Sequence, residues 1–161
     1  MLMQSKAQKI NIPEDLAKVI NGIIEIEDKI DQDKEHFFVI GVDNRNAIQY
    51  IDLVSLGTID AAFAEPRETF RLAVMKGVKS ILICHNHTSN ECEPSEDDLS
   101  ITLRLIKAGK ILGIELLDHV ILCKNKNKLF SFAREGLINE KNMINKINEK
   151  AVKEIKNFLK R

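Results

Sequence analysis

The sequence predicts an α/β protein with a mixed β-sheet flanked by helices. Segments rich in β-branched and aromatic residues alternate with segments whose apolar residues recur at helical spacing, which is typical of a layered α/β domain. An early hairpin and the last two strands indicate a sheet that is mixed rather than purely parallel. A length of 161 residues fits one domain with a sizeable core.

The N-terminal part of the chain is expected to form a helix followed by a hairpin. Pro13 suits a first helical turn, and apolar residues follow it at helical spacing until the polar stretch 28–34 ends the helix. Residues 35–43 are predicted to be a strand, 43–46 a turn and 47–54 the returning strand. The apolar stripe of the helix comprises Leu16, Val19, Ile20, Ile23 and Ile30.

In the middle of the chain, two helices are expected on either side of an apolar strand. Residues 65–77 form the second helix, with acidic residues and a proline at its start and a glycine at its end. Residues 80–84 are a nearly continuous apolar run, which indicates a strand covered on both faces. A polar loop, 85–94, leads to the third helix, which begins at Ser95 and stops at Gly113.

Two strands and a helix are expected to complete the chain. Residues 114–123 and 129–132 are the strands, joined by a turn at 124–128. Residues 139–161 form a basic amphipathic helix, in which seven basic residues against three acidic ones give a net charge of +4. We expect its apolar stripe to pack on the domain, with contact to nucleic acid or a partner as the alternative. The stripe comprises Ile144, Ile147, Ala151, Ile155 and Phe158.

Composition and charge exclude several classes of protein. The 24 basic and 24 acidic side chains cancel, which argues against holding nucleic acid by bulk charge. No apolar run approaches the roughly 18 residues of a membrane span, and residues 1–9 lack the apolar stretch of a secretory signal. Cys84, Cys92 and Cys123 are an odd number without the spacing of a disulfide framework, which favours the reducing cytoplasm.

The most informative motif lies where the apolar strand is expected to end. His85 and His87 are separated by one residue, so their side chains point to the same side of an extended backbone and can converge on one ion. Asp98 falls in the first turn of the next helix, from which its carboxylate can face that strand end. Two imidazoles and one carboxylate leave a fourth position open, as in a catalytic zinc site. We therefore expect these three residues to bind one zinc ion.

Two further residues are candidates for the chemistry of such a site. A metal-activated water needs a general base, for which Glu35 at the start of a strand is the candidate. Ser95 can donate a hydrogen bond to a developing oxyanion or hold the water. Ser95 and Asp98 also form an S-x-x-D pair that would cap the helix without any chemistry. The two roles are compatible, because the hydroxyl can cap while the carboxylate binds the metal.

The side chains near the motif have competing interpretations. Cys84 alternates away from His85 and is interpreted as a small buried apolar residue. Cys92, in the loop, could bind the metal or become oxidised. Asp118 and His119 lie in an apolar strand, where a satisfied structural pair is favoured and hydrogen bonding to the metal ligands is the alternative.

The histidine motif is part of a longer pattern. His85, His87, Ser95 and Asp98 follow the spacing H-x-H, seven residues, S-x-x-D, which is the JAMM signature. On this pattern, residues 80–123 closely resemble the RadC family, a bacterial branch of the JAMM/MPN metalloprotease-like domains. Upstream and downstream positions extend the resemblance to roughly residues 30–138. Further positions that carry the resemblance are 35–37, Asp43, 57–58, 66–68, Asn86, Ser89, Pro94, Thr102, 112–114, 117–119 and 131–137.

The resemblance implies a three-layer architecture of the JAMM/MPN, cytidine-deaminase-like type. It also implies zinc at the two histidines and the aspartate, with a glutamate on an upstream strand that activates the water. Glu35 matches that glutamate, whereas its rival Glu68 lies within a predicted helix. The expected organisation is an N-terminal helix in residues 1–30, a RadC-like JAMM/MPN domain in 31–138 and the basic helix in 139–161.

The preferred interpretation is a zinc-dependent hydrolase that resembles JAMM metallopeptidases. It would cleave a peptide or isopeptide-like amide in an unknown peptide or protein substrate, with Glu35 transferring the proton and Ser95 assisting the oxyanion. The alternative is a DNA-associated accessory module, for DNA repair or a mobile element, with a structural metal. Retention of the metal-binding pattern argues against a third possibility, a non-catalytic partner-binding domain. No membrane partner is expected.

Overall fold

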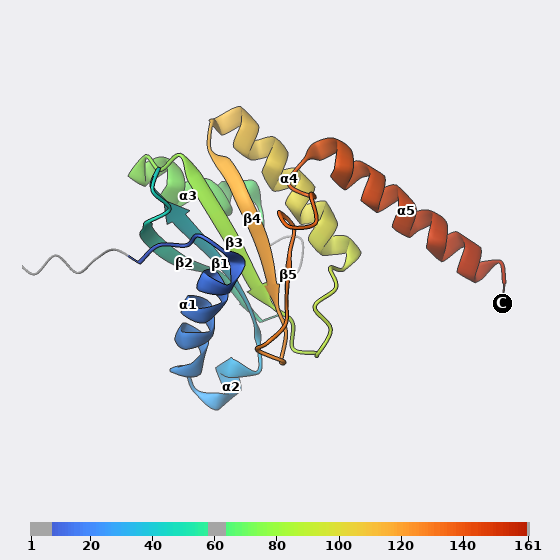
Figure 1. The fold of residues 1–161 in the computed structure, drawn as a ribbon, viewed down its shortest axis with the longest axis horizontal. Coiled ribbons are helices and arrows are strands. Elements are labelled where there is room, and N and C mark those ends of the chain that lie inside the picture. The colour runs from blue at the N-terminus through green and yellow to red at the C-terminus, as the bar shows by residue number, and fades with distance from the viewer. Residues whose placement is uncertain (1–7, 58–63, 161) are drawn as a thin grey trace, which may run out of the picture.

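The computed structural model describes residues 8–57 and 64–160, and Figure 1 shows a β-sheet with helices on both of its faces. The expectations that fall on residues 1–7, Thr58 and Arg161 lie outside the described residues. In chain order the elements are α1 (Pro13–Glu25), α2 (Lys29–Gln32), β1 (Glu35–Val42), β2 (Ile48–Gly57), α3 (Pro66–Lys76), β3 (Ser80–Asn86), α4 (Glu96–Leu112), β4 (Glu115–Leu122), β5 (Leu129–Ser131) and α5 (Glu140–Phe158).

The sheet is mixed, as the sequence predicts. Its strand order is β2-β1-β3-β4-β5. Strand β1 pairs antiparallel with β2 and β3, β5 pairs antiparallel with β4, and β3 and β4 run parallel. The predicted hairpin closes at a turn in which the Asp43 carboxylate accepts hydrogen bonds from the backbone N–H groups of Arg45 and Ala47. The α/β class with flanking helices is therefore confirmed.

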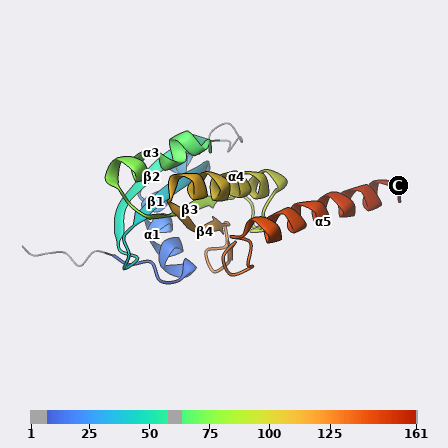
Figure 2. The ribbon, with the colours of Figure 1, turned by 90° about the horizontal axis from the view of Figure 1, so that it is seen from above.

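Successive side chains of a strand point to opposite faces of the sheet, so the hydrophobic core has two parts, one on each face. In β1, Phe37 and Val39 pack with residues of α3 and α4, whereas Phe38 and Ile40 pack with residues of α1. Cys84 lies in the α1 layer with no exposed surface, which confirms its interpretation as a small buried apolar residue. Figure 2 shows α1 and the pair α3–α4 on opposite sides of the sheet. The molecule thus has the three layers that the family resemblance implies.

The first helix is shorter than the sequence predicts. Helix α1 ends at Glu25, and Ile30, expected on its apolar stripe, lies in the separate helix α2 with 76% of its surface exposed. The Gln32 side chain donates hydrogen bonds to the carbonyl oxygens of Glu25 and Glu27. These bonds satisfy carbonyl groups that a longer helix would have paired internally, so the chain can turn here towards β1.

The middle helices begin and end where expected, but the strand between them is longer. Gly77 and Gly113 end α3 and α4 in the left-handed conformation, at φ of 66° and 68°. Strand β3 continues to Asn86, so His85 is a buried strand residue and not the first residue of a polar loop. The extra length comes from backbone pairing with the neighbouring strands. Strand β1 pairs with β3 as far as His85, and β4 pairs with β3 as far as Asn86.

The terminal helix α5 projects away from the rest of the molecule (Figures 1 and 2). Met143 is buried and Ile147 packs partly against the core, whereas Ile155 and Phe158 are 60% and 79% exposed. The expectation that the whole stripe packs on the domain is wrong, because a helix that starts beside α4 leaves the surface after its first turns. Neither α5 nor any other helix in the described ranges has the length and hydropathy needed to cross a membrane.

Candidate metal centre

The structure brings together the three side chains that the sequence predicts as metal ligands. One donor atom each from His85, His87 and Asp98 can be chosen so that all lie within 4.8 Å of one another. The Asp98 carboxylate lies between the imidazoles, with Oδ1 at 3.2 Å from Nε2 of His85 and Oδ2 at 3.3 Å from Nε2 of His87. These side chains come from β3, the residue after it and the first turn of α4.

Two local structures place these donors. Beyond the end of β3, the backbone N–H of His87 donates to the carbonyl of Leu122 at 2.7 Å, which keeps the chain extended and both histidines on one side. At the start of α4, the backbone N–H of Ser95 donates to Asp98 Oδ2 at 2.7 Å, and the backbone N–H of Asp98 donates to Ser95 Oγ at 3.1 Å. The predicted helix cap is therefore present, and it orients the carboxylate as well.

A chain of buried hydrogen bonds assigns the proton on His85. The Thr102 hydroxyl lies 2.5 Å from the carbonyl oxygen of Asp98, which can only accept, so the hydroxyl donates there. Thr102 Oγ1 must then accept from Nδ1 of His119, at 2.6 Å. This leaves Nε2 of His119 to accept from Nδ1 of His85, at 2.8 Å. In the neutral imidazole, Nε2 of His85 therefore carries a lone pair, and this buried atom has no hydrogen-bond partner among the residues that the structure describes.

The burial of His119 supports this assignment. Burial lowers the pKa of His119 well below its ordinary value, and the neighbouring His85 lowers it further. His119 is thus neutral, with one ring proton, as the chain of hydrogen bonds requires. The alternative interpretation of His119, hydrogen bonding to a candidate metal ligand, is correct, because its partner is His85. Asp118 instead binds the Ser131 hydroxyl at 2.6 Å and the backbone N–H of Ala133 at 2.8 Å, as expected of a structural residue.

His87, like His85, is oriented by a hydrogen bond at Nδ1. Its Nδ1 lies 3.0 Å from the carbonyl oxygen of Glu91 and donates to it, so Nε2 is the atom that faces Asp98. The hydrogen bond to Asp98 raises the pKa of His87, burial opposes this effect, and the Glu91 carbonyl adds to it. The His87 side chain is 16% exposed, compared with 2% for His85. The open side of the site is therefore at His87.

The Asp98 carboxyl is kept ionised. Burial by itself raises its pKa, but the two imidazoles beside it, those of His85 and His87, and the hydrogen bond from the Ser95 backbone outweigh burial and hold the pKa below its usual range. A buried carboxylate beside an imidazole lone pair is an arrangement that a cation would stabilise. The unpartnered Nε2 of His85 gives the same indication. The residues therefore fit a divalent metal ion, and their nitrogen and oxygen donors suit zinc among others.

The two residues expected to act on the substrate lie at the edges of this cluster. Glu35 is the first residue of β1 and two positions before Phe37, which is registered with His85, so Glu35 faces the same side of the sheet. Its negative charge contributes to the raised pKa of His87. Ser95 is exposed, and its hydroxyl donates to Asp98 Oδ2 at 2.8 Å. Their roles in catalysis stay predictions.

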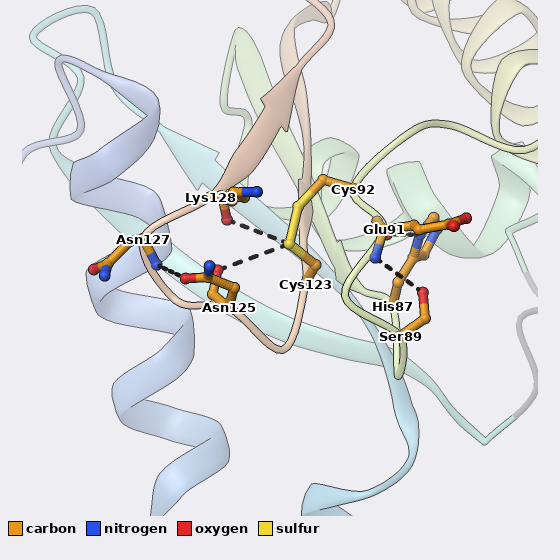
Figure 3. Close-up of a disulfide and its surroundings, with 8 residues drawn as sticks. All are labelled: His87, Ser89, Glu91, Cys92, Cys123, Asn125, Asn127 and Lys128. Atoms are coloured by element: carbon orange, nitrogen blue, oxygen red, sulfur yellow. Dashed lines mark hydrogen bonds between the residues drawn. A yellow bond between two sulfur atoms is a disulfide. The ribbon is translucent and has the colours of Figure 1, made fainter.

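Figure 3 shows a disulfide bond between Cys92, in the loop after β3, and Cys123, just after β4. The odd number of cysteines, which gave no sign of a disulfide framework in the sequence, therefore conceals one pair and one buried thiol, Cys84. Of the roles considered for Cys92, the structure shows oxidation. The bond lies next to Glu91, whose carbonyl orients His87, and the backbone N–H of Lys124 also donates to Ser89, at 3.0 Å. The loop that supports His87 is thus fixed to the end of β4.

Sequence reasoning did not assign functions to Thr102 and Asn86. Thr102 lies four residues after Asp98, one helical turn along the same face, which is a detectable signal for contact. Asn86 lies between the two histidines, and its side chain bonds to β1. No local pattern predicts that contact, because the partners are about 50 residues away.

A three-layer α/β domain whose central strand supplies a His-x-His pair, completed by an aspartate at the next helix N-terminus, is a JAB/MPN-type domain. A family model described as "RadC-like JAB domain" matches residues 10–137. The chain belongs to the RadC family.

Similar proteins from several bacteria agree with this placement. The chain is 36% identical over 129 residues to a UPF0758 protein of Desulforamulus reducens, and 38% identical over 130 residues to one of Clostridium botulinum. These alignments cover 80% and 81% of the chain and 54% of each relative. A UPF0758 protein of Syntrophomonas wolfei is 40% identical over 113 residues, which are 70% of the chain and 48% of that protein. The chain therefore spans about half the length of these relatives.

Proposed function

We propose that this protein is a hydrolase that cleaves a peptide or isopeptide-like amide bond, with one zinc ion held by His85, His87 and Asp98. The observation that carries the proposal is the arrangement of the ring nitrogens. Hydrogen bonds occupy Nδ1 of both histidines, so that Nε2 of each faces the Asp98 carboxylate. The exposed edge at His87 supports an open coordination position, as catalytic zinc sites have.

The residues of the chain would supply the proton transfers. A zinc ion in this site would lower the pKa of a coordinated water to about 7 and polarise a substrate carbonyl. Glu35 would accept the proton of the attacking water and deliver it to the leaving amine, so that water adds across the amide bond. The Ser95 hydroxyl, which donates to Asp98 in this structure, would turn its hydrogen towards the developing oxyanion.

Glu35→Gln tests this assignment, because it removes the base and keeps the size of the side chain. We expect at least a ~100-fold loss of hydrolysis with the zinc content unchanged. The measurements are elemental analysis of protein purified without chelator, and mass spectrometry of the products from a library of peptides and isopeptide-linked peptides. Glu68→Gln is the matched control, since Glu68 is a surface carboxylate on α3 beside Arg67 and Arg71.

Different outcomes would contradict different parts of the proposal. Full activity of Glu35→Gln with zinc bound would refute the base, and absence of metal in the wild-type protein would refute the zinc site. Zinc binding without hydrolysis of any library member would leave the second candidate, a DNA-associated accessory module with a structural metal.

The exposed lysines of α5 favour this second candidate. They extend along a helix that projects away from the domain (Figure 1). The measurement is binding to a DNA duplex. Two results would support this candidate: the logarithm of the binding constant falls linearly with the logarithm of the salt concentration, and binding is lost when these lysines are replaced by glutamine. The exposed lysines are Lys141, Lys153 and Lys156.

The cytoplasm is our proposed compartment, and peptides or proteins are the proposed substrates. The disulfide between Cys92 and Cys123 makes the compartment directly testable. Alkylation of free thiols in intact cells, followed by mass spectrometry, would show whether this pair is reduced, as the cytoplasmic proposal requires.

A further inference from the structure

The side chain of Asn86, the residue between the two histidines, takes the place of backbone hydrogen bonds where the pairing of β1 with β3 ends. The registered pairing of β1 with β3 reaches Phe37 and His85 at this end of the sheet. One residue further along, Asn86 Oδ1 accepts a hydrogen bond from the backbone N–H of His36 at 2.7 Å. Its Nδ2 donates to the carbonyl oxygen of Lys34 at 2.9 Å. The carboxamide thus binds β1 through one acceptor and one donor, as a backbone peptide group would.

These two hydrogen bonds flank Glu35. The Lys34 carbonyl belongs to the peptide unit before Glu35, and the His36 N–H belongs to the peptide unit after it. A single side chain therefore fixes both peptide planes that determine the direction of the Glu35 Cα–Cβ bond. That direction is towards the side of the sheet on which His85 lies, since Phe37 is registered with His85.

The neighbouring His36 reinforces this attachment. It is fully buried, its Nδ1 lies 2.9 Å from the same Lys34 carbonyl oxygen, and its Nε2 lies 2.6 Å from a carboxylate oxygen of Glu27. The imidazole also stacks on Phe38 with a centroid distance of 5.7 Å and an interplanar angle of 4°. The start of β1 is thus held from two directions, by Asn86 from β3 and by Glu27 from the segment after α1.

We propose that Asn86 is a positioning residue that couples Glu35 to the metal ligands His85 and His87. The inference rests on the proposed function of Glu35 and goes beyond it, because it assigns a task to the residue between the two histidines. Any shift of the β3 end moves the ligands and, through the Asn86 carboxamide, the backbone on both sides of Glu35. The base and the ion thereby keep one relative position although they belong to different strands.

The test uses Co²⁺ as the probe and needs no substrate. The pH midpoint of the visible absorption spectrum of the cobalt-loaded protein depends on charges near the ion. A carboxylate beside the ion opposes the loss of a proton there, so Glu35→Gln is expected to lower the midpoint. Asn86→Ala is expected to shift it in the same direction by a smaller amount, with the cobalt dissociation constant within about threefold of the wild-type value. A merely structural role for Asn86 would not move this midpoint.

Asn142→Ala is the matched control. Asn142 also ties a side-chain amide to a backbone carbonyl, that of Gly136 at 2.8 Å, but it lies in α5. This variant should leave the midpoint unchanged. Asn86→Leu provides a second variant of similar size, which removes both hydrogen bonds without adding a charge that would itself move the midpoint.

Each outcome decides between the proposals. A shift with Glu35→Gln but not with either Asn86 variant would overturn the inference and leave the base in place. No shift with Glu35→Gln would overturn the base, and the inference with it. Loss of cobalt binding in both Asn86 variants would also overturn the inference, because Asn86 would then hold the ligands and not Glu35.

Discussion

The protons of the candidate metal centre are ordered by the hydroxyl group of Thr102. Because the Asp98 carbonyl can only accept a hydrogen bond, the Thr102 hydroxyl hydrogen has one possible direction. The ring protons of His119 and His85 follow from it, and Nε2 of His85 is left with a lone pair. A side chain that is not itself one of the candidate metal ligands thus determines whether His85 can bind an ion.

Thr102→Val tests whether the Thr102 hydroxyl orients His85, because it removes the hydroxyl and keeps the shape of the side chain. Without the acceptor at Oγ1, His119 has no fixed tautomer, and His85 loses its orientation. We expect zinc affinity to fall about 10- to 100-fold, measured by competition with a chromophoric chelator.

Thr69→Val is the control for the loss of a buried hydroxyl. Thr69 is almost completely buried, and its Oγ1 has no hydrogen-bond partner within residues 8–57 and 64–160. The replacement should therefore leave zinc affinity unchanged. Equal affinities of Thr102→Val and the wild-type protein would show that the hydrogen-bond chain does not support His85.

At the scale of elements, the loop between β3 and α4 depends on a bond to a segment outside the loop. The loop contains His87 and ends at Ser95, and the disulfide joins its Cys92 to the segment after β4. Two backbone hydrogen bonds run alongside the disulfide, from His87 to Leu122 and from Lys124 to Ser89. The position of His87 is thus set jointly by its own strand and by β4.

Cys123→Ser is expected to lower the free energy of unfolding by about 3–4 kcal/mol relative to the oxidised wild-type protein. The physical reason is the chain entropy released when a loop with a sequence separation of 31 residues is no longer closed. Urea unfolding with and without dithiothreitol measures the difference. The reductant should bring the wild-type protein to the stability of the variant and should not change the variant. A wild-type protein that is insensitive to dithiothreitol would contradict the prediction.

Helix α5 is expected to contribute to stability only through its first turns. Met143 is fully buried, so Met143→Ala should cost about 2–5 kcal/mol of unfolding free energy. Ile155→Ala, on the projecting half, should change it by no more than about 0.5 kcal/mol. Thermal unfolding of the two variants makes the comparison. A large loss with Ile155→Ala would mean that the exposed stripe is covered in solution.

At the scale of the whole molecule, stability without metal should depend on pH through the site. His87 has a raised pKa in the folded protein, so its contribution is complete below about pH 6.5 and is lost as the pH rises through the folded pKa. His119 has a lowered pKa, so it destabilises the fold only below about pH 6.5. Asp98 has a lowered pKa and contributes at any pH well above 4.

We therefore expect the chelator-treated protein to lose stability as the pH is raised from about 6.5 to 8.5. Over the same range zinc affinity should rise, because the ion competes with the proton on His87. Denaturant unfolding and zinc titration at several pH values measure the two trends. Asp98→Asn should flatten the first trend, since an amide can still cap α4 but gives no charge for His87 to pair with. Stability that increases with pH above 6.5 would contradict the assignment.

Much of this architecture is predictable because it depends on local patterns. Hydrophobicity with a period of two predicted strands and hydrophobicity with a period of 3.6 predicted helices. Gly77 and Gly113 marked the ends of α3 and α4. The spacing of His85, His87, Ser95 and Asp98 predicted a cluster, since an extended strand and a capped helix start leave few ways to arrange these side chains. The division of the chain at residues 30 and 138 stays a prediction.

The sequence by itself thus predicted the fold class, the candidate group of metal ligands and the helix cap of this RadC-family chain. The tertiary structure decided the Cys92–Cys123 pairing, the attachment of Asn86 across Glu35, and the exposure of α5. The physical reason is distance along the chain. Periodicity and capping act over a few residues, whereas these contacts depend on how β1, β3 and β4 are placed beside one another.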